Sequence, residues 1–156
     1  MENISKHISY NEATKSNTAI KRGIYNIPNA TEVQNMEAVA QEVFEPVREA
    51  LGGKPLRLTS FFRSIALNRE IGGSSSSQHC KGEAMDIDAD GSHTTNKEVF
   101  MYIFENLCFD QLIWEFGDNQ SPDWVHVSYK RNGENRGQVL KAIKQEGKTR
   151  YIPYTG

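Results

Sequence analysis

Residues 77–87 read SQHCKGEAMDI and carry more chemical information than any other stretch of the chain. A serine-rich loop ends in His79, and residues 84–89 then alternate between apolar and acidic side chains. Alternation with period two is typical of a strand with one buried face, and it puts Asp86 on the opposite face. The stretch therefore predicts a half-buried strand whose exposed face is acidic and follows a histidine.

A second alternating segment, WVHVSY at residues 124–129, carries His126 in its middle. A hydrolytic zinc site needs three protein ligands and one open position, and two histidines with a carboxylate are a common set. His79, Asp86 and His126 supply that set. From spacing alone the assignment stays open, because a single His or Asp is more often a surface or capping residue.

The longest predicted helix opens near Thr31, which has Gln34 three residues later in a capping-box pattern. Apolar residues then recur at helical spacing through residues 33–47, and Gly52 follows the end of the pattern. Pro46 lies inside it and is expected to kink the helix or end its regular part, because proline lacks the N–H of the helical hydrogen bond.

Shorter elements are expected on both sides of the two alternating segments. We expect strands at residues 56–60 and 110–116, a short helix at 64–70, a helix from a Thr95/Glu98 capping box to about Leu107, and a final hairpin turning at 145–148. This order predicts an α+β class with a small, mainly antiparallel sheet packed with helices on one side. We expect one domain over 1–156, with an N-terminal arm at 1–30 and a basic C-terminal hairpin or tail at 130–156.

Composition limits the classes of partner. The chain has 156 residues, 37% of them hydrophobic, a net charge of -2 and two cysteines, which suits a single core without a disulfide scaffold. The C-terminal tail holds seven Lys and Arg against two Glu, but few aromatics and no groove-reading motif accompany them, so no nucleic-acid partner is expected.

The chain shows neither a secretion signal nor an apolar run near the ~18 residues of a membrane span. We therefore expect a protein made in the cytoplasm without a signal peptide, without stable membrane insertion, and monomeric. If its substrate lies in the cell wall, a phage-type or prophage lysis system would deliver it.

Three segments together resemble a known family. Residues 77–86 match its S-x-H-x-x-G-x-A-x-D pattern, TSFFRS at 59–64 its upstream segment ending in Arg-Ser, and DWVHVS at 123–128 its W-x-H-x-S strand. The family is that of zinc D-Ala-D-Ala carboxypeptidases and L-alanyl-D-glutamate endolysin peptidases, and the resemblance runs from about Thr59 to Tyr129. It implies a hedgehog/DD-peptidase-like fold, a Zn2+ cofactor, and hydrolysis of a peptide bond in the stem peptide or cross-link of peptidoglycan.

The resemblance also implies a catalytic carboxylate. Asp123, three residues before His126, matches the position at which relatives carry a catalytic Glu or Asp, so it is expected to be the general base and then the general acid. A turn at Pro122 would aim it at the reacting water. Glu115 is the rival, because it closes the neighbouring strand and could reach the same cavity.

Two further residues receive roles from the resemblance. Arg63 matches the family arginine that binds substrate or stabilises the developing oxyanion, and its planar guanidinium suits either task. Ser77 matches a serine that hydrogen-bonds substrate or orients the ligand loop. The alternatives are a surface ion pair for Arg63 and a plain linker for Ser77.

Two functions remain in competition. The first is a peptidoglycan peptidase, and the second is a non-catalytic zinc-bearing module that binds the cell wall. The joint presence of Asp123 and Arg63 favours the enzyme, because a binding module needs neither a base nor an oxyanion donor. The bond that is cut stays open between a D,D-carboxypeptidase, an L-Ala-D-Glu endopeptidase and a D,D-endopeptidase.

Overall fold

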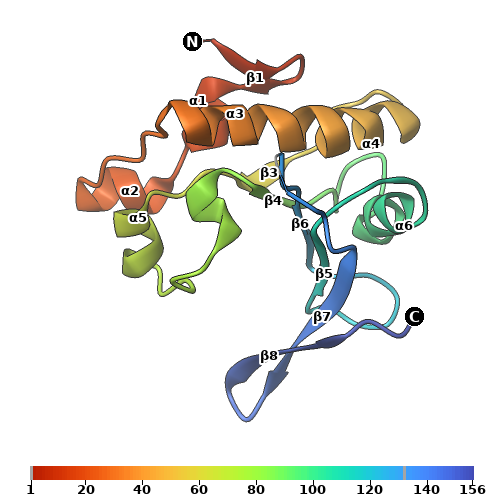
Figure 1. Cartoon of the computed structure of the whole chain (residues 1–156). Coiled ribbons are helices and arrows are strands. Elements are labelled where there is room, and N and C mark those ends of the chain that lie inside the picture. The colour runs from red at the N-terminus through yellow and green to blue at the C-terminus, as the bar shows by residue number, and fades with distance from the viewer. Residues whose placement is uncertain (1, 132) are drawn as a thin grey trace.

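The computed structural model describes residues 2–131 and 133–156 and confirms the α+β class (Figure 1). The helical elements are α1 (Tyr10–Thr14), α2 (Asn17–Arg22), α3 (Ala30–Val39), the π-helix η1 (Ala40–Phe44), α4 (Glu45–Ala50), α5 (Ile65–Glu70), the 3-10 helix η2 (Gln78–Lys81) and α6 (Asn96–Asn106). The strands are β1 (Asn3–Ser5), β2 (Ile8–Ser9), β3 (Leu58–Ser60), β4 (Ala84–Ile87), β5 (Gln111–Glu115), β6 (Trp124–Ser128), β7 (Gln138–Gln145) and β8 (Lys148–Pro153).

The main sheet has six strands in the order β3-β4-β6-β5-β7-β8, and β1 and β2 form a separate hairpin. All neighbouring strands of the main sheet run antiparallel except β5 and β7, which are parallel. The register sets Asp86 of β4 and Ile113 of β5 opposite His126 of β6, and Glu115 opposite Trp124. Residues opposite one another in a sheet share a face, so this register gathers polar side chains at its centre.

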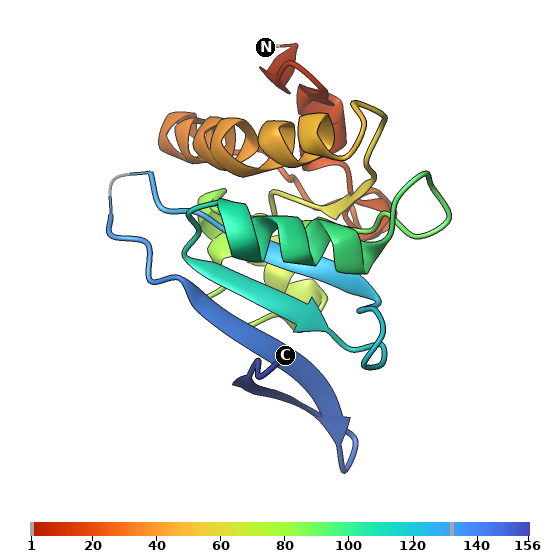
Figure 2. The same cartoon turned by 90° about the vertical axis from the view of Figure 1, so that its right-hand side faces the viewer.

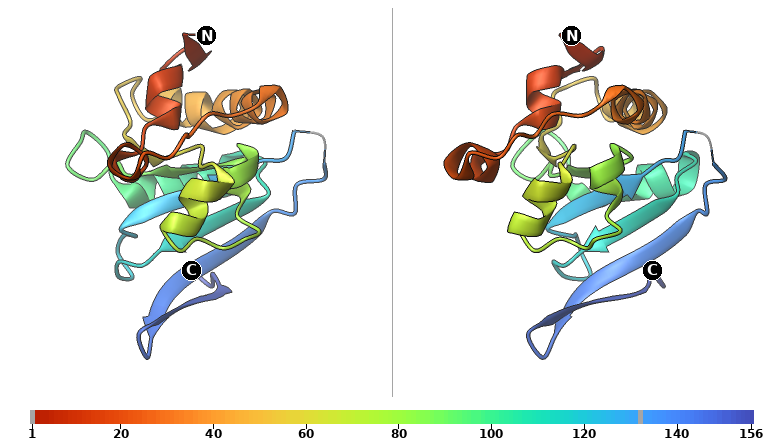
Figure 3. Two further views of the ribbon diagram at one scale, coloured as in Figure 1. Left: turned by 90° about the vertical axis from the view of Figure 1, so that its left-hand side faces the viewer. Right: turned by 60° about the vertical axis from the view of Figure 1, so that its left-hand side comes forward.

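The two faces of the sheet have different surroundings. One packs on α3, α4 and α6, and its residues Met85, Leu112 and Val127 are completely buried in the core (Figure 2). The other face carries Asp86, His126 and Glu115, and α5 and η2 lie over it (Figure 3). The sequence alternation has therefore separated a dry core from a polar, partly covered face.

The start of α3 differs from the sequence expectation. Its N-cap is Asn29, whose side-chain oxygen accepts from the N–H of Glu32, while the Glu32 carboxylate accepts from the N–H of Asn29, both at 2.8 Å. Asn caps better than Thr, and a carboxylate in the first turn also interacts favourably with the helix dipole. The expected pair of Thr31 and Gln34 therefore lies inside the helix.

Pro46 is accommodated without ending the helix. Residues 40–44 form a π-helical segment, and α4 begins at Glu45 with Pro46 in its first turn. Because proline cannot donate the usual hydrogen bond, one wider turn before it allows the chain to continue. Val43 and Val47 stay completely buried on either side of it.

Both ends of the chain pack on this body. Residues 1–30 were expected to form an arm, and Ile4 and Ile8 of its hairpin are buried while Glu45 binds Ser5 and His7. At the other end, β7 and β8 form the expected hairpin, which projects beyond the rest of the sheet (Figure 1). Within the described residues, none of the helices combines the length and apolar character that crossing a bilayer requires.

Candidate metal centre

His79 is held rigidly by its local structure. It lies on η2, where the Oγ of Ser77 accepts from the His79 N–H at 3.2 Å. Gly82 ends this turn with φ +75, and a Cβ there would lie 2.5 Å from the Glu32 carbonyl oxygen, so only glycine fits. The imidazole is 1% exposed, and its Nδ1 lies 2.7 Å from the Phe61 carbonyl oxygen.

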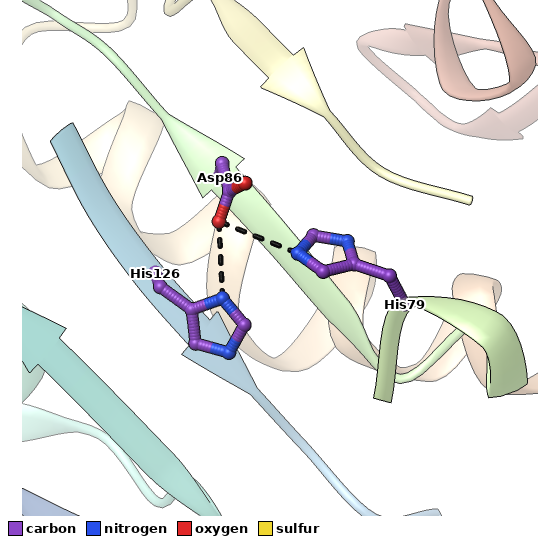
Figure 4. A group of neighbouring side chains, drawn as sticks. All are labelled: His79, Asp86 and His126. Carbon is purple, nitrogen blue, oxygen red and sulfur yellow. Dashed lines mark hydrogen bonds and ion pairs between the residues drawn. The ribbon is translucent and has the colours of Figure 1, made fainter. Parts of the chain in front are cut away.

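The strands bring Asp86 and His126 to the same place (Figure 4). Nδ1 of His126 lies 3.0 Å from Oδ1 of Asp86, and Nε2 of His79 lies 3.4 Å from that same oxygen. One ligand atom from each of His79, Asp86 and His126 lies within 4.8 Å of the other two. All three predicted ligands therefore converge, although they come from a 3-10 turn and two strands.

One atom in this cluster has no partner. The Phe61 carbonyl oxygen can only accept, so Nδ1 of His79 carries the proton and Nε2 presents a lone pair. Nε2 is buried and forms no hydrogen bond with the described residues. A buried lone pair beside a carboxylate oxygen is costly unless a proton or a cation lies between them. The donor set thus fits a metal ion, which would bind nitrogen and carboxylate oxygen together.

The carboxylate is already in the form that a metal needs. Burial alone raises the pKa of Asp86, but its interactions with His79 and His126 outweigh burial and hold that pKa well below its usual range. Asp86 is therefore an ionised ligand at neutral pH.

The predicted substrate residues Arg63 and Ser77 both line a cavity of ≈ 930 Å³, and Arg63 and Asp86 also line a neighbouring hollow of ≈ 650 Å³. The Arg63 N–H donates to the His79 carbonyl at 3.2 Å, which couples the arginine to the ligand turn. Its side-chain Nε is buried and makes no hydrogen bond with the described residues. Ser77 caps η2, so its Oγ orients the ligand turn.

Glu115 is the carboxylate that the structure brings to the cavity. It lies on the same face as His126, lines the larger part of the cavity and is 6% exposed. Burial raises its pKa from 4.5 to about 7, the attraction of His126 opposes that rise, and the repulsion of Asp86 adds to it. A buried carboxyl that titrates near neutrality can both take up and give back a proton.

Asp123, the base expected from the sequence, is not brought into this cavity. It is exposed and absent from the cavity lining, its N–H donates to the Glu115 carbonyl at 2.8 Å, and its own carbonyl accepts from Asn96 at 2.9 Å. Asp123 lies in the bend before β6 rather than on the strand that carries His126. The role of Asp123 as the base therefore stays a prediction from its family position.

A second ionic cluster, which the sequence did not reveal, lies beside the ligand turn. Asp110 is completely buried, and both its carboxylate oxygens bind the Arg136 side chain, at 3.0 and 2.8 Å. Gln78, the neighbour of His79, donates to the same carboxylate at 3.1 Å. Burial raises the pKa of Asp110, but the hydrogen bonds of Arg136 dominate and lower it to about 2. Nothing in the sequence links two residues 26 positions apart, so only the fold could show this pair.

Comparison with known proteins identifies the family of the chain. The family model described as Peptidase M15 matches residues 6–128, which include every candidate site residue. The zinc D-Ala-D-Ala carboxypeptidase of Streptomyces albus G is 40% identical to this chain over 45 residues. That alignment covers 29% of this chain and 18% of the relative, so the chain matches less than a fifth of that protein's length.

Proposed function

Because the chain belongs to the Peptidase M15 family, we propose that it is a zinc metallopeptidase that hydrolyses a peptide bond of peptidoglycan. The observation that carries the proposal is the buried, unpaired Nε2 of His79 beside Asp86 and His126. Two imidazoles and one carboxylate form the three-ligand set of a catalytic zinc site, which keeps one position open. The relative that is 40% identical over 45 residues is named for zinc and for D-Ala-D-Ala, and this supports both the metal and the substrate class.

His79, Asp86 and His126 would hold the zinc. Bound zinc supplies Lewis acidity, which polarises a carbonyl and makes water acidic enough to react at neutral pH. The protein prepares these ligands by fixing the proton of His79 on Nδ1 and by keeping Asp86 ionised. Such outer contacts set the orientation and basicity of metal ligands.

Glu115 is the proposed general base and general acid. Glu115 lines the cavity from the strand next to His126, and burial keeps its affinity for a proton high. It would take the proton of the attacking water and then deliver it to the leaving amine nitrogen, which restores the carboxylate. This assignment moves to Glu115 the role that the sequence gave to Asp123.

Arg63 is the proposed electrophilic partner. The negative charge of a tetrahedral intermediate develops on the former carbonyl oxygen, and donors placed there in advance lower the barrier. The buried Nε of Arg63 offers a donor that no described residue uses. The hydrogen bond from Arg63 N–H to the His79 carbonyl keeps this donor in register with the ligand turn.

The cavity also suits an acidic peptide. Lys81, Lys130 and Lys144 line its larger part, and Glu115 and the ligand Asp86 are the acidic residues among the described lining. Stem peptides carry free carboxylates along their length, so this cationic rim would favour their entry.

The test is the zinc-dependent release of peptidoglycan fragments. Protein stripped of metal and protein reloaded with one equivalent of zinc are incubated with purified peptidoglycan, and new amino termini are identified by mass spectrometry. We expect cleavage by the reloaded sample alone. Equal cleavage without zinc would contradict the metal assignment, and binding to the wall without new termini would favour the non-catalytic module.

A further inference from the structure

The cleft continues past the metal ligands. On the side away from Glu115 lies the smaller hollow of ≈ 650 Å³, between β3, α5 and the segment that joins α1 to α2. Arg63 and Asp86 line both this hollow and the larger one of ≈ 930 Å³. A substrate at the candidate metal centre therefore has room on both sides.

The wall of the smaller hollow is an edge strand. β3 is the first strand of the sheet and pairs with β4 alone, and Leu58, Thr59 and Ser60 all line the hollow. Edge strands present N–H and C=O groups on their outer side, and extended peptides bind there by adding a strand. Beyond Ser60 the edge is closed, because the N–H of Phe62 donates to the Ala13 carbonyl of α1 at 3.0 Å. The open edge thus matches about three residues of extended peptide.

The lining of the cleft where the two hollows meet distinguishes a carboxypeptidase from an endopeptidase. A carboxypeptidase needs a cation that holds the terminal carboxylate one residue beyond the scissile bond, and a wall that closes the cleft there. Arg63 lies at the junction, but the space continues past it along β3. Its buried Nε would donate equally well to a main-chain carbonyl of a peptide that passes through.

The cations of the smaller hollow are also partly neutralised. Arg57 donates to Asp88 at 2.7 Å, and Glu12 lines the same wall as Lys15. A site built for a terminal carboxylate would concentrate free positive charge, whereas this mixed lining suits a neutral main chain.

We propose that the chain is an endopeptidase, which binds an extended peptide across the metal centre with up to about three residues along the outer edge of β3. This inference rests on the proposed function and specifies its substrate. The product of each turnover would be two peptides, one with a new carboxylate and one with a new amine, and one water is consumed.

The first experiment separates the two kinds of cleavage. Zinc-loaded protein is incubated with a disaccharide pentapeptide ending in D-Ala-D-Ala, with its C-terminally amidated form, and with a cross-linked muropeptide dimer. We expect cleavage at an internal bond, no free D-Ala from the pentapeptide, and rates on the first two that agree within about twofold. Release of free D-Ala that amidation abolishes would overturn the inference and leave the proposed function intact. No zinc-dependent cleavage of any of the three, or of whole peptidoglycan, would instead contradict the proposed function.

The second experiment tests the hollow itself. Asn17 is exposed on α2 and lines the hollow, so Asn17→Trp would fill it without touching the ligands. Lys21→Trp is the matched control, because Lys21 is exposed on the same helix and lies outside both cavity linings.

The readout is kcat/KM on peptides that extend from one to three residues on each side of the cleaved bond. On the side of the cleaved bond that would lie along β3, lengthening the peptide from one to three residues should raise the kcat/KM of the wild type about tenfold. This gain corresponds to a few main-chain hydrogen bonds. Asn17→Trp should lose most of that gain, with unchanged zinc content and far-UV circular dichroism, while Lys21→Trp keeps it within about twofold. Binding along β3 would be refuted if the kcat/KM of the wild type did not depend on peptide length on either side of the bond. It would also be refuted if Asn17→Trp kept the full increase in kcat/KM with length.

Discussion

Asp86 and Asp110 are two shielded carboxylates near the same ligand turn, and they are satisfied in opposite ways. Asp110 accepts hydrogen bonds from Arg136 and Gln78, and Nζ of Lys130 lies 3.7 Å from its Oδ1. Asp86 instead faces two imidazoles, and the nearer nitrogen of His79 has no proton to give.

Complete hydrogen bonding distinguishes a buried cluster that only stabilises the fold from one that binds a ligand. A buried network with every donor and acceptor matched stabilises one conformation and needs no ligand. A buried cluster in which one acceptor faces another retains a cost that a bound cation removes. The two aspartates both have lowered pKa values, so the pKa alone would not distinguish them.

The sharpest way to break this comparison is to neutralise each carboxylate in turn. Asp86→Asn should abolish tight zinc binding and lower kcat/KM by roughly a thousandfold or more, because metal polarisation provides several kcal/mol of transition-state stabilisation. Asp110→Asn should keep one zinc per chain and lose less than about tenfold in kcat/KM. Elemental analysis of the purified proteins and a muropeptide assay measure both effects. Full zinc content in Asp86→Asn would mean that Asp86 is not a ligand.

The next prediction concerns the carboxylate that lines the cavity beside the metal ligands. Glu115→Gln should lower kcat by ~100- to 10,000-fold with zinc retained, since a positioned acid–base group contributes that much. Asp123→Asn should stay within about twofold, because Asp123 is exposed and does not line the cavity. Steady-state kinetics with parallel zinc analysis decide between them. The reverse result, with Asp123→Asn inactive and Glu115→Gln active, would restore the role that the sequence suggested.

A smaller effect is expected on the stability that the ion pair of Asp110 and Arg136 provides. Because the pKa of Asp110 falls from 3.8 to about 2 on folding, its ion pair stabilises the protein at pH values above about 4 and is lost as the pH falls through about 2. Arg136→Ala should therefore cost about 2 kcal/mol of unfolding free energy at pH 6 and clearly less at pH 2. Lys130→Ala is the control and should cost below about 0.5 kcal/mol, because its contact is long and partly exposed. Urea unfolding at the two pH values measures this, and a pH-independent loss in Arg136→Ala would exclude the ionic explanation.

The smallest expected effect lies where the two clusters meet. Gln78 donates to Asp110 and precedes His79, so it connects the Asp110–Arg136 ion pair to the candidate metal centre. Gln78→Ala should weaken zinc affinity by about tenfold, at the low end for outer contacts of metal ligands, with little change in stability. Competition with a chromogenic chelator gives the affinity. An unchanged affinity would show that the ligand turn does not depend on Asp110.

The sequence predicted more of the metal centre than of the catalytic machinery around it. The match to the family pattern selected His79, Asp86 and His126, and period-two alternation fixed the strand faces that carry Asp86 and His126. The same rule does not reach Asp123, because β6 begins at Trp124. At α3, Asn29-x-x-Glu32 and Thr31-x-x-Gln34 both fit a capping box, and local pattern alone could not choose between them.

Local periodicity and residue chemistry predicted the α+β class and the face that each strand turns inward, and the match to the family motif predicted the three candidate metal ligands. The tertiary structure brought Glu115 to the cavity, paired Asp110 with Arg136 and opened the hollow along β3. These features depend on which strands become neighbours and in what register, and that is set by long-range packing rather than by distance along the chain.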